Sequence, residues 1–473
     1  MADDLNTSYK YPFEEASEDL VKFGDGAIPG RPPGVPSSYD EGGSTRWTPE
    51  AISEVHALSQ LGRYQVRGFN TFNKRFPTFD DLTFVPATMT RLPLEGYRES
   101  CDTTTVLGGG RGIVEKPLEL KIPIYIASMS FGALSANAKE ALGHGASKVG
   151  TMTCTGEGGM LEEERAASKL LVYQMSPARY GLDLDHLRRA NGLEIVVGQG
   201  AKPGTGGLLL GMKISERVSR MRTLPIGVDQ RSTVRHPDWL GADDLAIKVE
   251  ELRIASNYQV PIFLKMGATR PRYDVAIAAK AGVDVIVVDG AEGGTGASPE
   301  LLLNHTGIPN MSAIRAAREA LDECGMSGKV SLVAAGGIRS GTDAAKCLAL
   351  GADAVMIGNA AMIALGCNSP RYLDDYKKLG TSPGACHHCH TGMCPVGIAT
   401  QTPELTERMD IAAGAERVAR YLTAMTMEIT ALAKACGKSN VHNLDIEDLR
   451  ALSFEASAFT GVKMAGIDRA FSW

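Results

Sequence analysis

Four cysteines could bind a redox group. Cys386, Cys389 and Cys394 are spaced C-x2-C-x4-C and are followed by Pro395, and Cys367 lies upstream of them. Thiolates at such short spacing are typical ligands of an iron–sulfur cluster, and a proline after the last ligand recurs in ferredoxin-type sites. The spacing therefore favours an iron–sulfur site.

Two other interpretations of this stretch stay open. His387, His388 and His390 are interleaved with the cysteines, and imidazole and thiolate together are typical zinc ligands. A C-x-x-C pair also serves thiol–disulfide chemistry. We rank zinc second and a redox disulfide third.

Two glycine-rich segments predict a phosphate site. One contains Gly336 and Gly337, and the other contains Gly358 and Asn359; we expect them to follow the seventh and eighth strands. In barrel folds these two loops commonly bind phosphate through backbone amides and a helix N-terminus. The alternative is that the glycines only make tight turns. Because a redox cluster is expected nearby, we expect the phosphate to belong to flavin mononucleotide (FMN).

Charged residues gather at the ends of predicted strands. Lys265 ends an apolar strand, where its cation could face a reduced flavin anion or a substrate carboxylate. Glu157 lies between glycines, which suggests close packing by a ligand. Glu292 is a further candidate for proton transfer, and Arg179 is a candidate carboxylate ligand. The alternatives are solvent exposure for Lys265 and the glutamates, and pairing with a local acid for Arg179.

The spacing of apolar residues predicts an α/β fold. Short β-branched runs alternate with amphipathic helical patterns, as in a parallel sheet that is covered by helices. The predicted strands are 122–127, 148–152, 194–199, 224–228, 261–265, 284–289, 330–335 and 353–357. The predicted helices are 47–64, 134–143, 242–255, 273–281, 311–323, 342–350, 404–435 and 445–452. Eight such strands favour a (β/α)8 TIM barrel over an open doubly wound sheet.

We divide the chain into four parts on this pattern. Residues 1–118 form an N-terminal arm and a lead-in segment, of which roughly the first 45 residues read as irregular because they are polar and rich in Pro and Gly. Residues 119–365 form the barrel, 366–402 the cysteine-bearing excursion after the eighth strand, and 403–473 the C-terminal helices.

Composition narrows the class of protein. The 473 residues carry a net charge of −6 without a long basic run, so we expect neither nucleic acid nor an anionic membrane as a partner. The first residues do not resemble a signal peptide, and no apolar run reaches the length of a membrane span. Nine unevenly placed cysteines do not suggest an extracellular disulfide framework, so we expect a cytoplasmic protein.

Five ordered motifs resemble the FMN-binding synthase domain of glutamate synthase. They lie at 128–135, 155–159, 199–204, 293–299 and 394–401, within a match that runs from about 75 to 402. In length and in its stand-alone barrel the chain is similar to archaeal-type short glutamate synthases. It is still more similar to the large subunit of N-methylglutamate synthase (methylamine–glutamate N-methyltransferase).

The resemblance implies FMN on a barrel with a three-iron cluster beside it. The residues it implies at the flavin are Ser128, Met129, Ser130, Gln199, Lys265, Gly336, Gly337, Gly358 and Asn359. Those it implies at the substrate are Ser130, Glu157 and Lys265, and we add Arg179 as a carboxylate ligand. It implies catalytic roles for Lys265 and Glu157, and we consider Glu292 for proton transfer as well.

The chain departs from the family in two respects. From its first residues and its length, we expect it to lack the nucleophilic cysteine of the amidotransferase domain and the β-helical domain. We expect both domains as separate subunits of a hetero-oligomer, with their complete absence as the alternative. The family spacing C-x5-C-x4-C aligns Cys367, Cys389 and Cys394 with the three ligands, and an insertion brings in Cys386. Either Cys386 replaces Cys367 in a [3Fe-4S] cluster, which we favour, or all four cysteines bind a [4Fe-4S] cluster.

The resemblance leads to one preferred function and three alternatives. We expect an enzyme that forms N-methylglutamate from glutamate and methylamine through 2-oxoglutarate or 2-iminoglutarate, with the hydride held on FMN. The first alternative is glutamate synthase, which makes glutamate from 2-oxoglutarate and ammonia with an external reductant. The second is a non-catalytic electron-transfer subunit. The third is another FMN-barrel oxidoreductase, similar to inosine-phosphate dehydrogenase, which the cysteine stretch disfavours.

Overall fold

The computed structural model describes residues 47–71 and 74–467 and divides into two compact units. The larger unit comprises Val66–Cys367 and His388–Trp473, and the smaller comprises Met1–Gln65 and Asn368–His387. The irregular arm predicted for roughly residues 1–45 lies outside the described residues.

The smaller unit contains the predicted helix over 47–64. It is α2 (Pro49–Leu61), which begins after Thr48, whose hydroxyl accepts from the amide of Ala51 at 3.3 Å, and ends at Gly62 with a φ of +60°. These are an ordinary N-cap and a left-handed C-cap. A 3-10 turn, η3 (Pro370–Tyr372), and the short helix α13 (Leu373–Lys378) belong to the same unit.

The larger unit is built on eight parallel strands, as the sequence predicts. They are β5 (Ile124–Ile126), β6 (Met152–Cys154), β7 (Leu170–Met175), β8 (Gly192–Val196), β11 (Ile262–Gly267), β12 (Val285–Asp289), β14 (Ser331–Ala335) and β15 (Ala354–Ile357). They pair in the order β5-β15-β14-β12-β11-β8-β7-β6. The two ends of this sheet come together where the Thr151 hydroxyl donates to the carbonyl of Ile124 at 2.5 Å, so the barrel is nearly closed.

One predicted strand is wrong and another was overlooked. Residues 224–228 form a turn, because Pro225 lacks a ladder donor and Gly227 has a φ of +73°. The third barrel strand is instead β7. The predicted strand over 148–152 is shifted to β6, because helix α3 (Ala136–Val149) continues to Val149.

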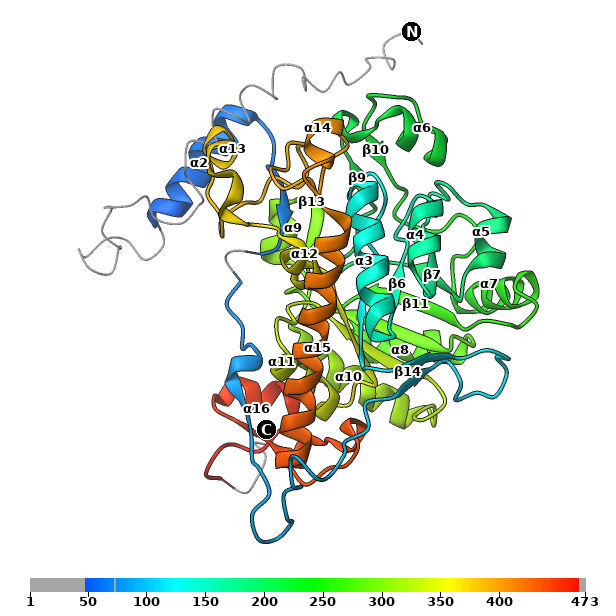
Figure 1. The fold of residues 1–473 in the computed structure, drawn as a ribbon, viewed down its shortest axis with the longest axis vertical. Helices are drawn as coiled ribbons and strands as arrows, with labels where there is room; N and C mark the ends of the chain where they lie inside the picture. The colour runs from blue at the N-terminus through cyan, green and yellow to red at the C-terminus, as the bar shows by residue number, and fades with distance from the viewer. Residues whose placement is uncertain (1–46, 72–73, 468–473) are drawn as a thin grey trace, which may run out of the picture. The chain divides into compact units, whose positions relative to one another are not determined.

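Helices cover the outside of the barrel (Figure 1). The longer ones are α3, α7 (Ala242–Ala255), α8 (Pro271–Lys280), α10 (Asn310–Glu323), α11 (Gly341–Ala349) and α15 (Ile411–Ala435). The shorter ones are α4 (Glu162–Ala167), α5 (Leu184–Arg189), α6 (Glu216–Arg222), α9 (Glu300–His305), α12 (Asn359–Leu365), α14 (Pro403–Thr406) and α16 (Phe454–Thr460). Within the described ranges, no helix is both long and apolar enough to cross a bilayer.

Short strand pairs complete this unit. The lead-in strand β1 (Val66–Phe69) pairs with β13 (Thr295–Pro299), β9 (Leu208–Leu209) pairs with β10 (Gln230–Arg231), and β16 (Leu449–Ala451) pairs with β2 (Leu82–Phe84). The helix predicted for 445–452 is therefore wrong: a short 3-10 turn and β16 occupy it, because strand pairing with β2 replaces helical hydrogen bonds.

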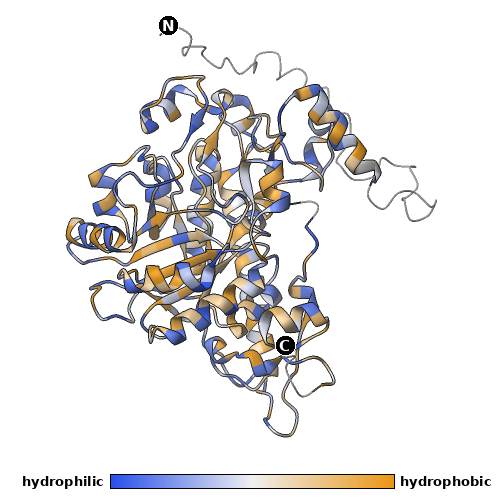
Figure 2. Ribbon diagram, turned by 180° about the vertical axis from the view of Figure 1, so that it is seen from behind, coloured by the Kyte–Doolittle hydropathy of each residue, from blue (hydrophilic) through white to orange (hydrophobic). Residues whose placement is uncertain are grey.

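The barrel interior is an apolar core that is closed at its amino-terminal end. Tyr125, Phe263 and Val287 from three strands lie in one buried cluster. The hairpin of β3 (Thr105–Leu107) and β4 (Leu118–Leu120) adds its leucines to the same cluster. Figure 2 shows the hydrophobic strands inside and the more polar helices outside. Burial of this surface is the main stabilising contribution.

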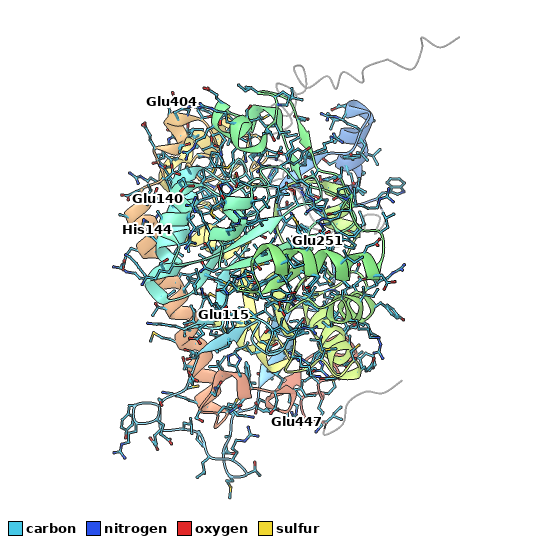
Figure 3. All side chains as sticks on the ribbon, turned by 90° about the vertical axis from the view of Figure 1, so that its right-hand side faces the viewer. Glu115, Glu140, His144, Glu251, Glu404 and Glu447 are labelled. Atoms are coloured by element: carbon cyan, nitrogen blue, oxygen red, sulfur yellow. The ribbon has the colours of Figure 1, made fainter. Side chains whose placement is uncertain are left out.

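Helix α15 runs alongside α3, and a glycine lets them approach closely (Figure 1). A Cβ on Gly145 would lie 2.8 Å from a methyl carbon of Val418 and 3.0 Å from the carbonyl oxygen of Ala415. Glu140 and His144, on the outer side of α3, are partly or fully exposed (Figure 3).

The close contact of the two helices predicts a stability effect. Gly145→Ala should lower the free energy of unfolding by about 1–3 kcal/mol, because overpacking outweighs the gain in helix propensity. Urea unfolding monitored by circular dichroism measures this. Gly241→Ala is the control, since a Cβ there meets no atom within 4 Å. An equally stable Gly145→Ala variant would show that α15 can move away from α3.

Candidate functional site

A cavity of about 740 Å³ opens at the carboxyl ends of the barrel strands, within the larger unit. This volume lies in the range of ordinary cofactor and ligand sites. Loops after β5, β8, β12, β14 and β15 line it, together with β1, the residues that follow β1, and β13.

The cavity brings together most of the side chains and glycines that the sequence singled out. Its lining includes Ser128, Met129, Ser130, Glu157, Gln199, Lys265, Glu292, Gly336, Gly337, Gly358 and Asn359. Cys389 lines it as well. Arg179 does not.

Two glycines after β14 form one side of the cavity in a left-handed conformation. Gly336 has a φ of +100° and Gly337 a φ of +73°. A Cβ on Gly336 would lie 2.9 Å from the carbonyl oxygen of Gly290, and one on Gly337 would lie 2.6 Å from the Cβ of Glu292. Both positions therefore require glycine, and their backbone is accessible to a ligand.

Glu292 lies against this glycine turn. Both of its carboxylate oxygens accept from the backbone N–H of Asn310, at 2.9 and 3.1 Å, where α10 begins. The Asn310 side chain in turn donates to the carbonyl of Gly336 at 2.6 Å. Burial raises the pKa of Glu292 to about 7, while the backbone donors and Lys74 oppose this shift. Glu292 thus connects α10 to the glycine turn.

The loop after β5 is held from behind by a buried lysine. Lys139 donates to the carbonyls of Met129 and Thr155, and it pairs with Glu164 at 2.8 Å. A Cβ on Gly156 would lie 2.4 Å from the backbone nitrogen of Ser130. Gly156 therefore packs against protein backbone. This contact alone accounts for one of the two glycines that flank Glu157, and no ligand is needed to explain it.

Lys265 extends from β11 to the floor of the cavity and is 5% exposed. Its Nζ lies 3.3 Å from the Ser128 hydroxyl and 3.8 Å from a carboxylate oxygen of Asp289. Asp289 also accepts from the backbone N–H of Gly200 at 3.0 Å. The lysine is thus positioned by groups from β5 and β12.

Glu157 presents its carboxylate to the cavity. One oxygen accepts from the Ser232 hydroxyl at 3.0 Å, and a Cβ on Gly207 would lie 2.0 Å from the other. The buried Arg222 donates to the carbonyl of Glu157 at 3.2 Å and to the side chain of Gln230 at 2.6 Å. A Cβ on Gly158 would overlap the Arg222 guanidinium, so the second glycine that flanks Glu157 also makes a protein contact.

Lys202 is a cavity residue that the sequence reasoning missed. It is 3% exposed, lines the cavity, and donates to the carbonyl of Ala297 at 2.7 Å. Burial lowers the pKa of Lys202 to about 8, while the charge of Glu157 opposes the shift. The sequence did contain a signal for this role. Lys202 lies three residues beyond Gln199, in a glycine-containing loop that follows a predicted strand.

Arg179 lies outside this cavity. Its guanidinium contacts Asp238, which also pairs with Lys248, and it contacts the sulfur of Met175. In this structure Arg179 therefore pairs with a local acid, as the alternative interpretation expected. Its role as a carboxylate ligand stays a prediction.

Of the four candidate cysteines, Cys389 lies at the cavity. Lys213 donates to the carbonyl of Cys389 at 2.8 Å. Burial lowers the pKa of Lys213 to about 8, while the charges of Cys389 and Cys394 oppose the shift, so both thiols lie near one cation. Cysteine binds iron through its sulfur, so both residues stay candidate ligands.

The ligand set of a cluster remains a prediction. Cys386 belongs to the smaller unit, whereas Cys367, Cys389 and Cys394 belong to the larger, and all four are half-buried. Across residues 47–71 and 74–467, no three Cys, His, Asp or Glu side chains are close enough together to hold a metal ion.

The residues around the cavity fit a flavin nucleotide. Gly336, Gly337 and Gly358 line the cavity without side chains, and Lys265 offers a cation on the floor. Ser128 and Met129, in the loop after β5, also line the cavity. This donor set suits an anionic phosphate together with an electron-accepting ring.

Comparisons with known sequences identify relatives. The conserved region of glutamate synthase matches residues 65–439. A glutamate synthase large subunit-like protein from Rhizobium meliloti is 54% identical over 415 residues, which is 88% of this chain and 93% of that protein. The archaeal glutamate synthase [NADPH] of Methanocaldococcus jannaschii is 34% identical, over 89% of this chain and 85% of that protein.

Solved structures support the fold. A flavocytochrome b2 variant with benzoylformate aligns with a TM-score of 0.51 at 16% identity, covering 86% of this chain and 87% of the other. At this identity the likeness shows a shared barrel fold and no shared substrate.

The glycine turn gives a prediction for nucleotide binding. Gly337→Ala should weaken FMN binding by about tenfold or more, because a strained left-handed alanine would also displace Glu292. Quenching of flavin fluorescence measures the affinity. Gly328→Ala is matched in φ, at +75°, but meets no atom within 4 Å and should bind FMN normally. Equal affinities in both variants would mean that the turn does not contact the nucleotide.

Lys202 gives a prediction for pH. The lysine is an ammonium below its pKa of about 8 and neutral above it, so affinity for the dicarboxylate 2-oxoglutarate should fall as the pH rises through 8. Calorimetric titration between pH 6.5 and 9.5 measures this. Lys202→Met should bind weakly at every pH, whereas Lys148→Met, at an exposed lysine on α3, should keep the normal profile. A pH-independent affinity in the unmodified protein would exclude Lys202 as the carboxylate ligand.

Proposed function

Because this chain belongs to the glutamate synthase family, we propose that it is the FMN-binding subunit of an enzyme that converts glutamate and methylamine into N-methylglutamate and ammonia. The observation that carries the proposal is the cavity, which combines a glycine cradle for phosphate with Lys265, Lys202 and Glu157. The name of the 54% identical relative, a large subunit-like protein, supports a role as one subunit of a larger complex.

The cavity residues have distinct roles in this proposal. FMN, when bound, supplies reversible storage of a hydride. Lys202 binds a carboxylate of glutamate, and its burial strengthens the interaction because little water competes with it. Lys265 holds positive charge on the cavity floor. Lys202 therefore orients the amino acid, while Lys265 faces the flavin.

Glu157 is the proposed proton-transfer group at nitrogen. Its carboxylate reaches the cavity and is oriented by the Ser232 hydroxyl, so it can take a proton from the incoming methylamine and return one to the departing ammonia. Replacing one amine by another then requires no net oxidation, since glutamate and N-methylglutamate have the same oxidation state. Glu292, which supports the glycine turn, is a positioning residue in this proposal.

We also propose an iron–sulfur cluster and two partner subunits. Cys389, Cys394 and either Cys386 or Cys367 would hold a [3Fe-4S] cluster, supported by the cation of Lys213 beside two of the thiols. A four-cysteine [4Fe-4S] cluster is the alternative. The partners would be a glutamine-amidotransferase-like subunit and a β-helix-domain subunit, as the resemblance to full-length glutamate synthases implies.

A second function is favoured by other relatives. The 34% identical relative carries the name archaeal glutamate synthase [NADPH], which favours formation of glutamate from 2-oxoglutarate and ammonia with an external reductant. A purely electron-transferring subunit is the weakest alternative, because it gives no reason for two buried lysines and a glutamate around the cavity.

A turnover experiment separates these functions. The reconstituted complex should form N-methylglutamate from glutamate and methylamine without NAD(P)H, and Glu157→Gln should lower kcat at least about 100-fold, the usual contribution of a general acid–base group. Mass spectrometry of the product measures this, with Glu140→Gln, at a partly exposed acid on α3, as the control. Activity that requires an added reductant and 2-oxoglutarate would show that the enzyme is a glutamate synthase. Full activity of the Lys265→Ala variant would favour an electron-transfer subunit.

A further inference from the structure

A buried carboxyl group lies inside the barrel beneath the cavity. Glu194, on β8, is 1% exposed and accepts a hydrogen bond from the Gln174 side chain at 2.6 Å. The Cys154 thiol lies 3.6 Å from the same oxygen. Barrel interiors are usually filled by branched apolar side chains, so a carboxyl group here calls for an explanation.

The register of the strands places Glu194 next to Lys265. Glu194 pairs with Phe263 on the neighbouring strand β11, and Lys265 is two residues further along. Since side chains two residues apart on a strand share a face, both side chains point into the barrel, with Lys265 nearer the cavity. The strongest favourable charge interaction of the Glu194 carboxylate is with Lys265.

The Ser128 hydroxyl connects the two groups. It lies 3.3 Å from the Nζ of Lys265, and a hydrogen bond from Ser128 is among the interactions that stabilise the Glu194 carboxylate. A hydroxyl can accept from an ammonium and donate to a carboxylate at the same time. The Ser128 hydroxyl, in a residue that itself lines the cavity, therefore interacts with both groups.

We propose that Glu194 is a positioning residue that acts together with Ser128 on Lys265, as the buried counter-charge that orients this lysine on the cavity floor. The inference rests on the proposed function in that Lys265 faces the flavin. It goes further because it assigns a role to a residue that does not line the cavity.

Other groups face Glu194 and limit the effect. Burial raises the pKa of Glu194, whereas Lys265, Gln174, Cys154 and Ser128 oppose that shift. Asp289 is a second acid beside Lys265, at 3.8 Å, and would retain part of the counter-charge if Glu194 were removed. Tyr125 and Cys154 face the same interior, and burial raises the pKa of both groups well above their usual values, so neither competes as an anion.

The test is the midpoint potential of bound FMN at pH 7, measured by spectroelectrochemistry on the full-length, FMN-loaded protein. A nearby cation stabilises the negative charge of a reduced flavin, whereas a buried anion opposes it. In Glu194→Gln the midpoint potential should therefore rise, because the loss of the counter-charge leaves more positive charge beneath the flavin.

Tyr125→Phe is the matched control, since it changes the same barrel layer by one hydroxyl that makes no hydrogen bond within the described part of the chain. Its midpoint potential should equal that of the unmodified protein. An unchanged potential in Glu194→Gln, or an equal shift in both variants, would overturn the inference.

A third variant keeps the proposal testable if Glu194→Gln does not fold. Ser128→Ala removes the hydroxyl that contacts Lys265 and should shift the midpoint potential by a smaller amount, and an unchanged potential would overturn the inference. Failure of the unmodified protein to bind FMN would instead contradict the proposed function. Failure of the inference and failure of the proposed function are thus distinguishable.

Discussion

The loops at the carboxyl ends of the barrel strands pack backbone against backbone, and the cavity depends on this contact. A Cβ on Gly200 would lie 1.9 Å from the carbonyl oxygen of Gly290, and one on Gly156 would lie 2.4 Å from the backbone nitrogen of Ser130. Gly336 closes on Gly290 in the same way. Side chains cannot enter these contacts, so the loops converge tightly and their amides remain available to a ligand.

Charge inside the barrel is arranged around this backbone framework. Asp289 accepts from the amide of Gly200, and the same carboxylate lies beside Lys265. Glu292 in turn joins the start of α10 to the turn at Gly337. Asp289 is therefore held by a backbone donor as well as by an opposite charge, which reduces the cost of removing it from water. The rigidity of the loops and the positions of the charges thus have a common origin.

Periodicity and glycine spacing predicted the barrel and most of the cavity lining, because both depend on local residue types. The strand at 224–228 was predicted wrongly since its apolar composition outweighed Pro225, and β7 was overlooked. Arg179 and Lys202 show a different limit. Whether a cation faces a cavity or a neighbouring acid is decided by tertiary contacts with Asp238 and Ala297, which lie far away in the sequence. The cysteine spacing predicts a type of ligand, but the choice between Cys367 and Cys386 depends on how the inserted segment folds.

The hairpin of β3 and β4 gives the barrel only one open end. Its leucines belong to the same buried cluster as Phe263 and Val287, so hydrocarbon seals the side opposite the cavity. Water and protons that reach the interior carboxyl group must then pass through the cavity mouth. A ligand that fills the cavity would then lie between the interior carboxyl group and the solvent.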